Sequence, residues 1–157
     1  MQIPGLAYDG EHLHLRLAGA AAAVDEAVAR LAPETIDEGD TWWDALRDLR
    51  LARGEPGARL WRLSTPPAAT IEAQPLREIV DWGGAQRWWS GSALSAADIH
   101  ARLRAAVGSQ GHAEPMFAAT RDEQPPLSAT RRALQARLRA AFDPASLFNR
   151  GCSRVAA

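Results

Sequence analysis

Alternating apolar and polar positions predict two β-hairpins. Leucines alternate with polar residues over 11–18, which is typical of a half-buried strand, and residues 2–8 would pair with it. Asp9-Gly10 lies between these strands and favours a two-residue turn, because such turns need positive φ at their central positions. A second hairpin is predicted over 78–89, where Gly83-Gly84 separates two runs rich in β-branched and aromatic residues. Two shorter runs are also predicted to be strands: 59–64 and 112–118.

Apolar residues that recur every three to four positions predict four helices: about 20–31, 41–52, 95–107 and 128–142. Their apolar stripes are, in chain order, Val24, Val28 and Leu31; Trp42, Leu46 and Leu49; Ile99, Leu103 and Val107; and Leu134, Leu138 and Ala141. Asp40 or Thr41 is expected to cap the second helix, Ser95 and Asp98 form a capping box for the third, and Ser128 caps the fourth.

The order of these elements predicts an α+β fold. Two hairpins combined with strand–helix–strand units favour an antiparallel β-sheet with helices packed mainly on one face, including ferredoxin-like elements. The sequence has no internal repeat, and its length suits a single domain over 1–157. Asp143-Pro144 would stop the last helix and leave an irregular tail over 145–157.

Composition narrows the class of protein further. The 157 residues carry a net charge of −1 and 24% charged residues, which gives no strong field for nucleic acid. No apolar run approaches the ~20 residues of a membrane span, and the N-terminus lacks an export signal. We therefore expect a cytoplasmic protein with no nucleic-acid partner and no membrane span. The single cysteine, Cys152, excludes an intrachain disulfide and a multi-cysteine metal site.

Motifs of self-contained catalysis are absent from the sequence. It has no dinucleotide-binding or P-loop glycine pattern and no metalloprotease or serine-hydrolase motif. His12 and His14 share one face of a predicted strand, but no third ligand lies near them, so we expect no metal site and a solvent-facing pair. The acidic stretch 25–48 and the arginine-rich last helix are interpreted as solvated faces.

Tryptophan is the unusual residue, with six in the chain. Trp42 and Trp61 fall in periodic segments and are predicted to lie in the core. Trp88 and Trp89 are adjacent on a predicted strand, so their side chains must point to opposite faces. We therefore expect an aromatic surface around them, together with Trp82, that binds a partner or forms a pocket.

Three stretches, 60–64, 80–88 and 142–151, together resemble the C-terminal domain of the FAD-binding subunits of bacterial glycolate oxidases, which are flavoproteins of the vanillyl-alcohol-oxidase type. The similarity runs over about 3–152 and includes Gly111-His112-Ala113. Its most specific part is Trp82-Gly83-Gly84-Ala85-Gln86-Arg87-Trp88. The resemblance implies that the chain is a C-terminal cap domain and that the N-terminal FAD-binding domain is absent from it.

This resemblance implies oxidation of a small 2-hydroxy acid, glycolate to glyoxylate, with FAD bound in the intact protein and none in this chain alone. The isolated chain is then expected to be inactive. The partners implied are the subunit's own N-terminal FAD domain, a second flavin subunit and an iron–sulfur subunit, which could place the complex peripherally at the inner membrane.

Four residues are candidates for the chemistry that the resemblance implies. Arg87 would bind the substrate carboxylate, or else would be a structural arginine that stacks on tryptophan or pairs with Asp81. His112 would accept a proton, or else would be a hydrogen-bonded strand histidine. Phe148 and Asn149 would lie near the flavin of the missing domain. The sequence departs from the family there, since Asn149-Arg150-Gly151-Cys152 replaces Asn-Pro-Gly-Arg.

Two other classes of function stay open at this point. The chain could be a non-catalytic assembly module that docks the other oxidase subunits through Trp82, Trp88, Trp89 and the acidic stretch 25–48. It could also be a ferredoxin-like domain that senses a small molecule, a hypothesis that rests on fold analogy alone.

Overall fold

The computed structural model describes residues 2–36, 38–54, 58–72, 75, 77–91, 95–116 and 128–148. The chain divides into two compact units, Met1–Gln124 and Pro125–Ala157. Each unit is treated by itself below. Within the described residues, no helix is long and apolar enough to cross a membrane.

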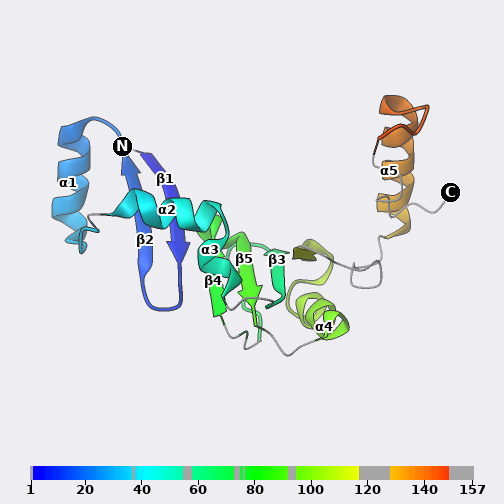
Figure 1. Ribbon diagram of the computed structural model, residues 1–157, viewed down its shortest axis with the longest axis horizontal. Helices are drawn as coiled ribbons and strands as arrows, with labels where there is room; N and C mark the ends of the chain where they lie inside the picture. The colour runs from blue at the N-terminus through cyan, green and yellow to red at the C-terminus, as the bar shows by residue number, and fades with distance from the viewer. Residues whose placement is uncertain are drawn as a thin grey trace. The chain divides into compact units, whose positions relative to one another are not determined.

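The first unit contains a six-stranded antiparallel sheet, seen in Figure 1 from the blue strands at the N-terminus to the green ones. Its strands are β1 (Gln2–Tyr8), β2 (Leu13–Ala18), β3 (Leu60–Ser64), β4 (Arg77–Asp81), β5 (Gln86–Ser90) and β6 (His112–Met116). They lie side by side in the order β2-β1-β4-β5-β3-β6. The predicted α+β class and antiparallel sheet are confirmed.

The helices begin and end close to the predicted positions. They are α1 (Ala21–Leu31), α2 (Gly39–Arg47), α3 (Arg50–Arg53), α4 (Ala96–Val107) and α5 (Ala129–Phe142). The predicted helix over 41–52 is split into α2 and α3, because Leu49 adopts a left-handed conformation with φ of 59°. The cap proposed for it is wrong, since α2 begins at Gly39 and makes no side-chain cap hydrogen bond. The Ser95–Asp98 capping box and the Ser128 cap are both confirmed.

Helices cover both faces of the sheet. One core packs Ile79 and Trp88 of the sheet against Leu46 of α2 and Ala52 of α3. The other packs strand residues against Ile99 and Leu103 of α4, with Trp61, Leu63 and Trp89 on the strands. The expected arrangement had helices mainly on one face. The difference follows from β5, whose adjacent indoles point to opposite faces and need a cover on each side.

Both hairpin loops are longer than predicted. The Cα partners Tyr8 and Leu13 leave a four-residue loop between β1 and β2, and Asp81 and Gln86 leave another between β4 and β5. The two-residue turns predicted at these places are therefore wrong. In the first loop, the Asp9 carboxylate accepts hydrogen bonds from the backbone N–H groups of residues 11 and 12, at 3.0 and 2.8 Å, and so holds the turn.

His14 is not the solvent-facing residue that the sequence predicted. Its Nε2 atom lies 2.8 Å from Asp9 Oδ2, and its ring stacks on Trp42 of α2 with 3.8 Å between ring centroids. The side chain is largely buried, because α2 lies over this face of β2. Within the described residues, no group of three potential ligands could hold a metal ion.

The second unit is described over 128–148 and consists of α5 and a short turn. No residue of α5 is buried, so the predicted inner face, with Leu134 and Leu138, is exposed. The reason is that the described part of this unit offers no second layer of structure. The helix ends at Phe142 as predicted, and the Asp143 carboxylate accepts hydrogen bonds from the backbone N–H groups of Leu147 and Phe148.

The partly exposed carboxylate of Asp9 in the first hairpin leads to a pH-dependent prediction. Burial raises the pKa of Asp9, but hydrogen bonds from the backbone at His12, from His14 and from the backbone at Glu11 outweigh it and lower this pKa from 3.8 to about 2. Asp9→Asn keeps an accepting oxygen but removes the charge. We expect it to lower the free energy of unfolding at pH 7 by about 1 kcal/mol, measured by urea denaturation.

The difference in the free energy of unfolding between the wild type and Asp9→Asn is expected to depend on pH. The charged form stabilises the fold above the unfolded pKa, so the difference should shrink as pH falls from about 4 to about 2. Asp25→Asn, on the exposed surface of α1, is the control and should change stability by only a few tenths of a kcal/mol. If Asp9→Asn lowered the free energy of unfolding by the same amount at every pH, the stabilising role of the charged Asp9 carboxylate would be contradicted.

Candidate functional site

A pocket of about 890 Å³ lies in the first unit, between α2, the N-terminal hairpin and the loop between β4 and β5. Its walls carry three indole side chains, Trp43, Trp82 and Trp88. Its polar groups include Asp81 and Gln86 from the sheet. This volume is in the range of small-molecule sites, which are mostly apolar with a few placed polar groups.

The sheet register explains why these residues meet. Asp81 and Gln86 are Cα partners on neighbouring strands, so their side chains share one face. Trp88 follows two residues after Gln86 and therefore points to the same face. Trp43 reaches the pocket from α2, above Gly5 of β1. A Cβ atom on Gly5 would lie 2.8 Å from Trp43 Cη2, so only glycine lets the indole pack there.

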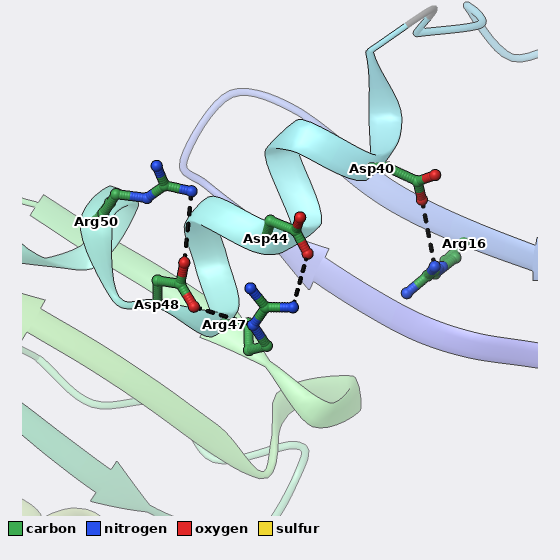
Figure 2. A network of polar contacts seen from close by, with 6 residues as sticks. All are labelled: Arg16, Asp40, Asp44, Arg47, Asp48 and Arg50. Atoms are coloured by element: carbon green, nitrogen blue, oxygen red, sulfur yellow. Dashed lines mark hydrogen bonds and ion pairs between the residues drawn. The ribbon is translucent and has the colours of Figure 1, made fainter.

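Figure 2 shows a network of exposed ion pairs on and beside α2. Three of its residues also line the pocket: Arg16, Asp44 and Arg47. Arg16 lies 3.2 Å from Asp40, Arg47 lies 2.9 Å from both Asp44 and Asp48, and Arg50 lies 3.5 Å from Asp48. The hydrogen bond from Arg47 lowers the pKa of Asp48. Because these pairs are exposed and screened, they contribute little to stability. They do neutralise the two arginines that line the pocket.

Asp81 has a different environment. Its Oδ1 atom accepts a hydrogen bond from the backbone N–H of Trp82 at 2.7 Å, and it forms no ion pair within the described residues. Burial raises the pKa of Asp81, and the N–H groups of Trp82 and Trp88 only partly offset that effect. Asp81 is therefore a half-buried carboxyl group without a cation, inside a mostly apolar pocket.

Trp88 places a buried donor beside the Asp81 carboxyl. Its side chain is 7% exposed, and Nε1 makes no hydrogen bond in the described part of the chain. The indole N–H is close enough to Asp81 to lower the pKa of that group, yet the two groups do not meet the geometry of a hydrogen bond. The indole N–H therefore interacts with the Asp81 carboxyl and favours its charged form.

The loop beside the pocket is held by its glycines. Gly84 has φ of 98°, and a Cβ atom there would lie 2.4 Å from the carbonyl oxygen of Pro67. Thr65 fixes the same loop, since its N–H donates to the carbonyl of Ala85 at 2.9 Å and its hydroxyl donates to that of Gly84 at 3.2 Å. Gly84 of the motif thus serves close backbone packing, whereas a Cβ atom on Gly83 would meet only Leu6 Cδ2, at 4.0 Å.

Arg87 lies on the face of the sheet opposite the pocket. Its Nη1 lies 3.1 Å from Glu78 Oε1, and its Nη2 donates to the carbonyl of Ala69 at 2.6 Å. The same Glu78 oxygen accepts from Trp89 Nε1 at 2.8 Å. The pairing with Asp81 that the sequence suggested is therefore wrong, because Asp81 lies on the other face. Nε of Arg87 has no hydrogen-bond partner among the described residues.

His112 lies on the pocket face but two strands away from Gln86. Its Nε2 is 3.1 Å from Glu114 Oε1, and Arg62 donates to the other oxygen of Glu114 at 2.5 Å. Burial raises the pKa of Glu114, but these two partners outweigh burial and lower it. His112 is thus a hydrogen-bonded strand histidine, and the sheet separates it from Arg87.

The three tryptophans proposed as a partner surface do not share one exposed face. Trp82 is 73% exposed, whereas Trp88 and Trp89 are buried in different cores. The expectation of an exposed face at 88–89 is wrong, because α2–α3 and α4 cover the two sides. Phe148 is 66% exposed in the second unit, and Asn149 lies outside the described residues.

Sequence reasoning missed Asp81, Gln86 and Trp43 as site residues. A two-residue turn at Gly83-Gly84 pairs position 82 with 85 and therefore 81 with 86, which is the register that the structure has. The shared face of residues 81, 86 and 88 could thus be predicted from the sequence, but the sequence did not show that a pocket lies over that face. Trp43 gave no signal, since the predicted stripe of its helix ran through Trp42.

The chain is 33% identical over 151 residues to the glycolate oxidase subunit GlcE of Escherichia coli (strain K12). The chain is thus a relative of a glycolate oxidase subunit. The resemblance seen in the sequence is confirmed. The match covers 96% of this chain and 41% of GlcE, so the chain spans less than half the length of that relative. No model of a protein family matches the chain, and no solved structure matches it.

The close packing of Gly84, in the 82–88 motif, leads to a direct prediction. Gly84→Ala places a methyl group against the Pro67 carbonyl and forces alanine to a positive φ. We expect it to lower the free energy of unfolding by about 3 kcal/mol or more, measured by thermal and urea denaturation.

Gly10→Ala is the matched control for this substitution. Gly10 has a similar φ of 103°, but a Cβ atom there would meet nothing within 4 Å. The strain of alanine at a positive φ should then lower the free energy of unfolding by about 1 kcal/mol. Equal losses for the two variants would show that contact with Pro67 does not matter.

Proposed function

We propose that this chain is the cap domain of an FAD-dependent glycolate oxidase subunit. The observation that carries the proposal is the similarity to GlcE, which extends over almost the whole chain yet covers 41% of the relative. The remaining part of such a subunit would hold FAD and oxidise a small 2-hydroxy acid, glycolate to glyoxylate. This domain would shape the space beside that centre.

Among the described residues, the glycine pair of the 82–88 motif does not form a phosphate cradle for a dinucleotide. A phosphate cradle needs glycines whose backbone a ligand can approach closely. The space above Gly84 is filled by the Pro67 carbonyl, so this glycine packs against protein instead. We therefore place FAD in a domain outside this chain, with Phe148 and Asn149 as the residues that would lie near it.

Arg87 and His112 are kept as candidates for substrate contact, with one restriction. They point to opposite faces of the sheet, so a single small substrate cannot touch both. Arg87 has two guanidinium nitrogens committed to Glu78 and Ala69. To bind a substrate carboxylate, Arg87 would have to donate from Nε or give up its hydrogen bond to Glu78 or Ala69.

A second candidate function is a non-catalytic assembly module. Trp82 favours it, because an indole exposed to 73% at the mouth of a pocket is typical of an anchor in a protein interface. The partners would be a second flavin subunit and an iron–sulfur subunit of a glycolate oxidase.

A chimera tests the cap-domain proposal. In E. coli GlcE, the part that matches this chain is replaced by residues 1–157, and the chimera is expressed in a strain that lacks GlcE. We expect glycolate-dependent dye reduction in extracts, because the replaced part would supply the same cap. The measurement is the rate of dye reduction with and without glycolate.

GlcE without the matching part is the negative control, and intact GlcE is the positive one. The isolated chain is expected to show no glycolate-dependent dye reduction. A chimera that accumulates as folded protein, binds the other subunits and still gives no more activity than the truncated control would overturn the proposal.

Trp82→Ala in that chimera separates the two candidate functions. If Trp82 anchors a partner, we expect the affinity of the complex to fall by about 30-fold, as loss of an interface hot spot does. Flavin reduction by glycolate in the purified chimera should then be retained. Loss of flavin reduction with the complex intact would instead favour a role beside the substrate.

A further inference from the structure

The pocket contains a carboxyl group whose charge no described cation balances. Asp81 lines the pocket and keeps part of its surface accessible. Its two neighbours are N–H groups: the backbone N–H of Trp82, which donates to Oδ1 at 2.7 Å, and the indole N–H of Trp88. Both favour the charged form of Asp81 but carry no net charge themselves. Because a carboxylate can accept about four hydrogen bonds, Asp81 keeps acceptor capacity toward the pocket.

The two arginines that line the pocket do not compensate this charge. Arg16 is paired with Asp40, and Arg47 is paired with two aspartates. Arg16 also lies on β2, two strands away from β4, which carries Asp81. Neighbouring strands are about 4.8 Å apart, so the two strands are separated by about a Debye length. The uncompensated charge at the Asp81 end of the pocket is therefore negative.

The walls of the pocket suit a cation that has an aromatic body. The side chains of Trp43 and Trp82 line it, and both keep accessible surface. Indole is the aromatic ring that attracts cations most strongly, and aromatic rings also pack well on indoles. The volume of about 890 Å³ is in the range that small organic ligands occupy.

We propose that this pocket binds a small primary amine that carries an aromatic ring, with the ammonium group donating to Asp81 and the ring packed against Trp43 and Trp82. The amide oxygen of Gln86, which shares a face with Asp81, can accept from the same ammonium group. A ligand of this kind is a cation, whereas the substrate of the proposed function is a small anion. The amine site therefore goes beyond that function and is tested separately from it.

Three probes that share a phenylethyl skeleton test the chemistry of the site. They are phenethylamine, 2-phenylethanol and phenylacetate: a cation, a neutral alcohol and an anion. Each is titrated into the 157-residue chain at neutral pH and low salt, followed by ¹H–¹⁵N NMR. We expect phenethylamine to bind with a Kd of about 1 mM, as a fragment of this size does, and at least about 5-fold more tightly than the alcohol. The backbone N–H of Trp82 should shift, since it bonds to Asp81.

Substitution of Asp81 separates the charge of the site from its shape. Asp81→Asn keeps an oxygen for the backbone N–H of Trp82 but removes the charge, so phenethylamine binding should weaken by about 5- to 10-fold. Binding of 2-phenylethanol should not change. Asp25→Asn is the matched control, because it removes the same charge from the exposed surface of α1, and it should leave the binding of all three probes unchanged.

A second variant tests the indole contact without touching the carboxylate. Trp82 is 73% exposed, so Trp82→Leu removes the ring at little risk to the core. It should weaken phenethylamine binding by about 3-fold. If thermal unfolding shows that Asp81→Asn does not fold, this variant and the three probes on the wild type decide the question.

The results that support the site are a preference for phenethylamine over both other probes and its loss in Asp81→Asn. Four results overturn it: equal binding of the amine and the alcohol, tighter binding of phenylacetate, the same affinity for phenethylamine in folded Asp81→Asn as in the wild type, or no shift with any probe at about ten times the expected Kd. Unchanged phenethylamine binding by Trp82→Leu would overturn the indole contact.

Discussion

The first unit depends on two adjacent indoles that point in opposite directions from one strand. Trp88 is 7% exposed and Trp89 is 1% exposed, each in a separate core. Truncating a buried tryptophan typically costs about 3–5 kcal/mol, so neither face of β5 can be left open to solvent. One helix layer on each side is the physical consequence, with α2–α3 over Trp88 and α4 over Trp89.

The same alternation of side chains along β5 decides which polar residues share a face of the sheet. Arg87 shares a face with Trp89 and is held there by Glu78, whereas Gln86 shares a face with Trp88 and lines the pocket with Asp81. A sheet covered on both sides therefore separates the two residues that the sequence favoured for catalysis. It also brings Trp88 Nε1 and the Asp81 carboxyl together on one face.

Much of the fold could be predicted from periodicity, because local patterns carry it. All six strands and the four long helices were placed within a few residues, and Ser95 and Ser128 cap helices as expected. What could not be predicted depends on contacts distant in sequence: the stack of His14 on Trp42 and the close approach of Gly84 to Pro67. The length of the first loop was missed because the Asp9 side chain supplies the turn. The pocket was missed because Trp43 reaches it from a distant element of the sequence.

Hydrogen exchange of the six indole N–H groups, followed by NMR, tests the central claim most directly. That claim is a sheet closed on both faces around β5. It predicts fast exchange for Trp82, which is 73% exposed, and slow exchange for both Trp88 and Trp89. If either of the two exchanged as fast as Trp82, one face of β5 would be open, and the arrangement of cores and pocket described above would be contradicted.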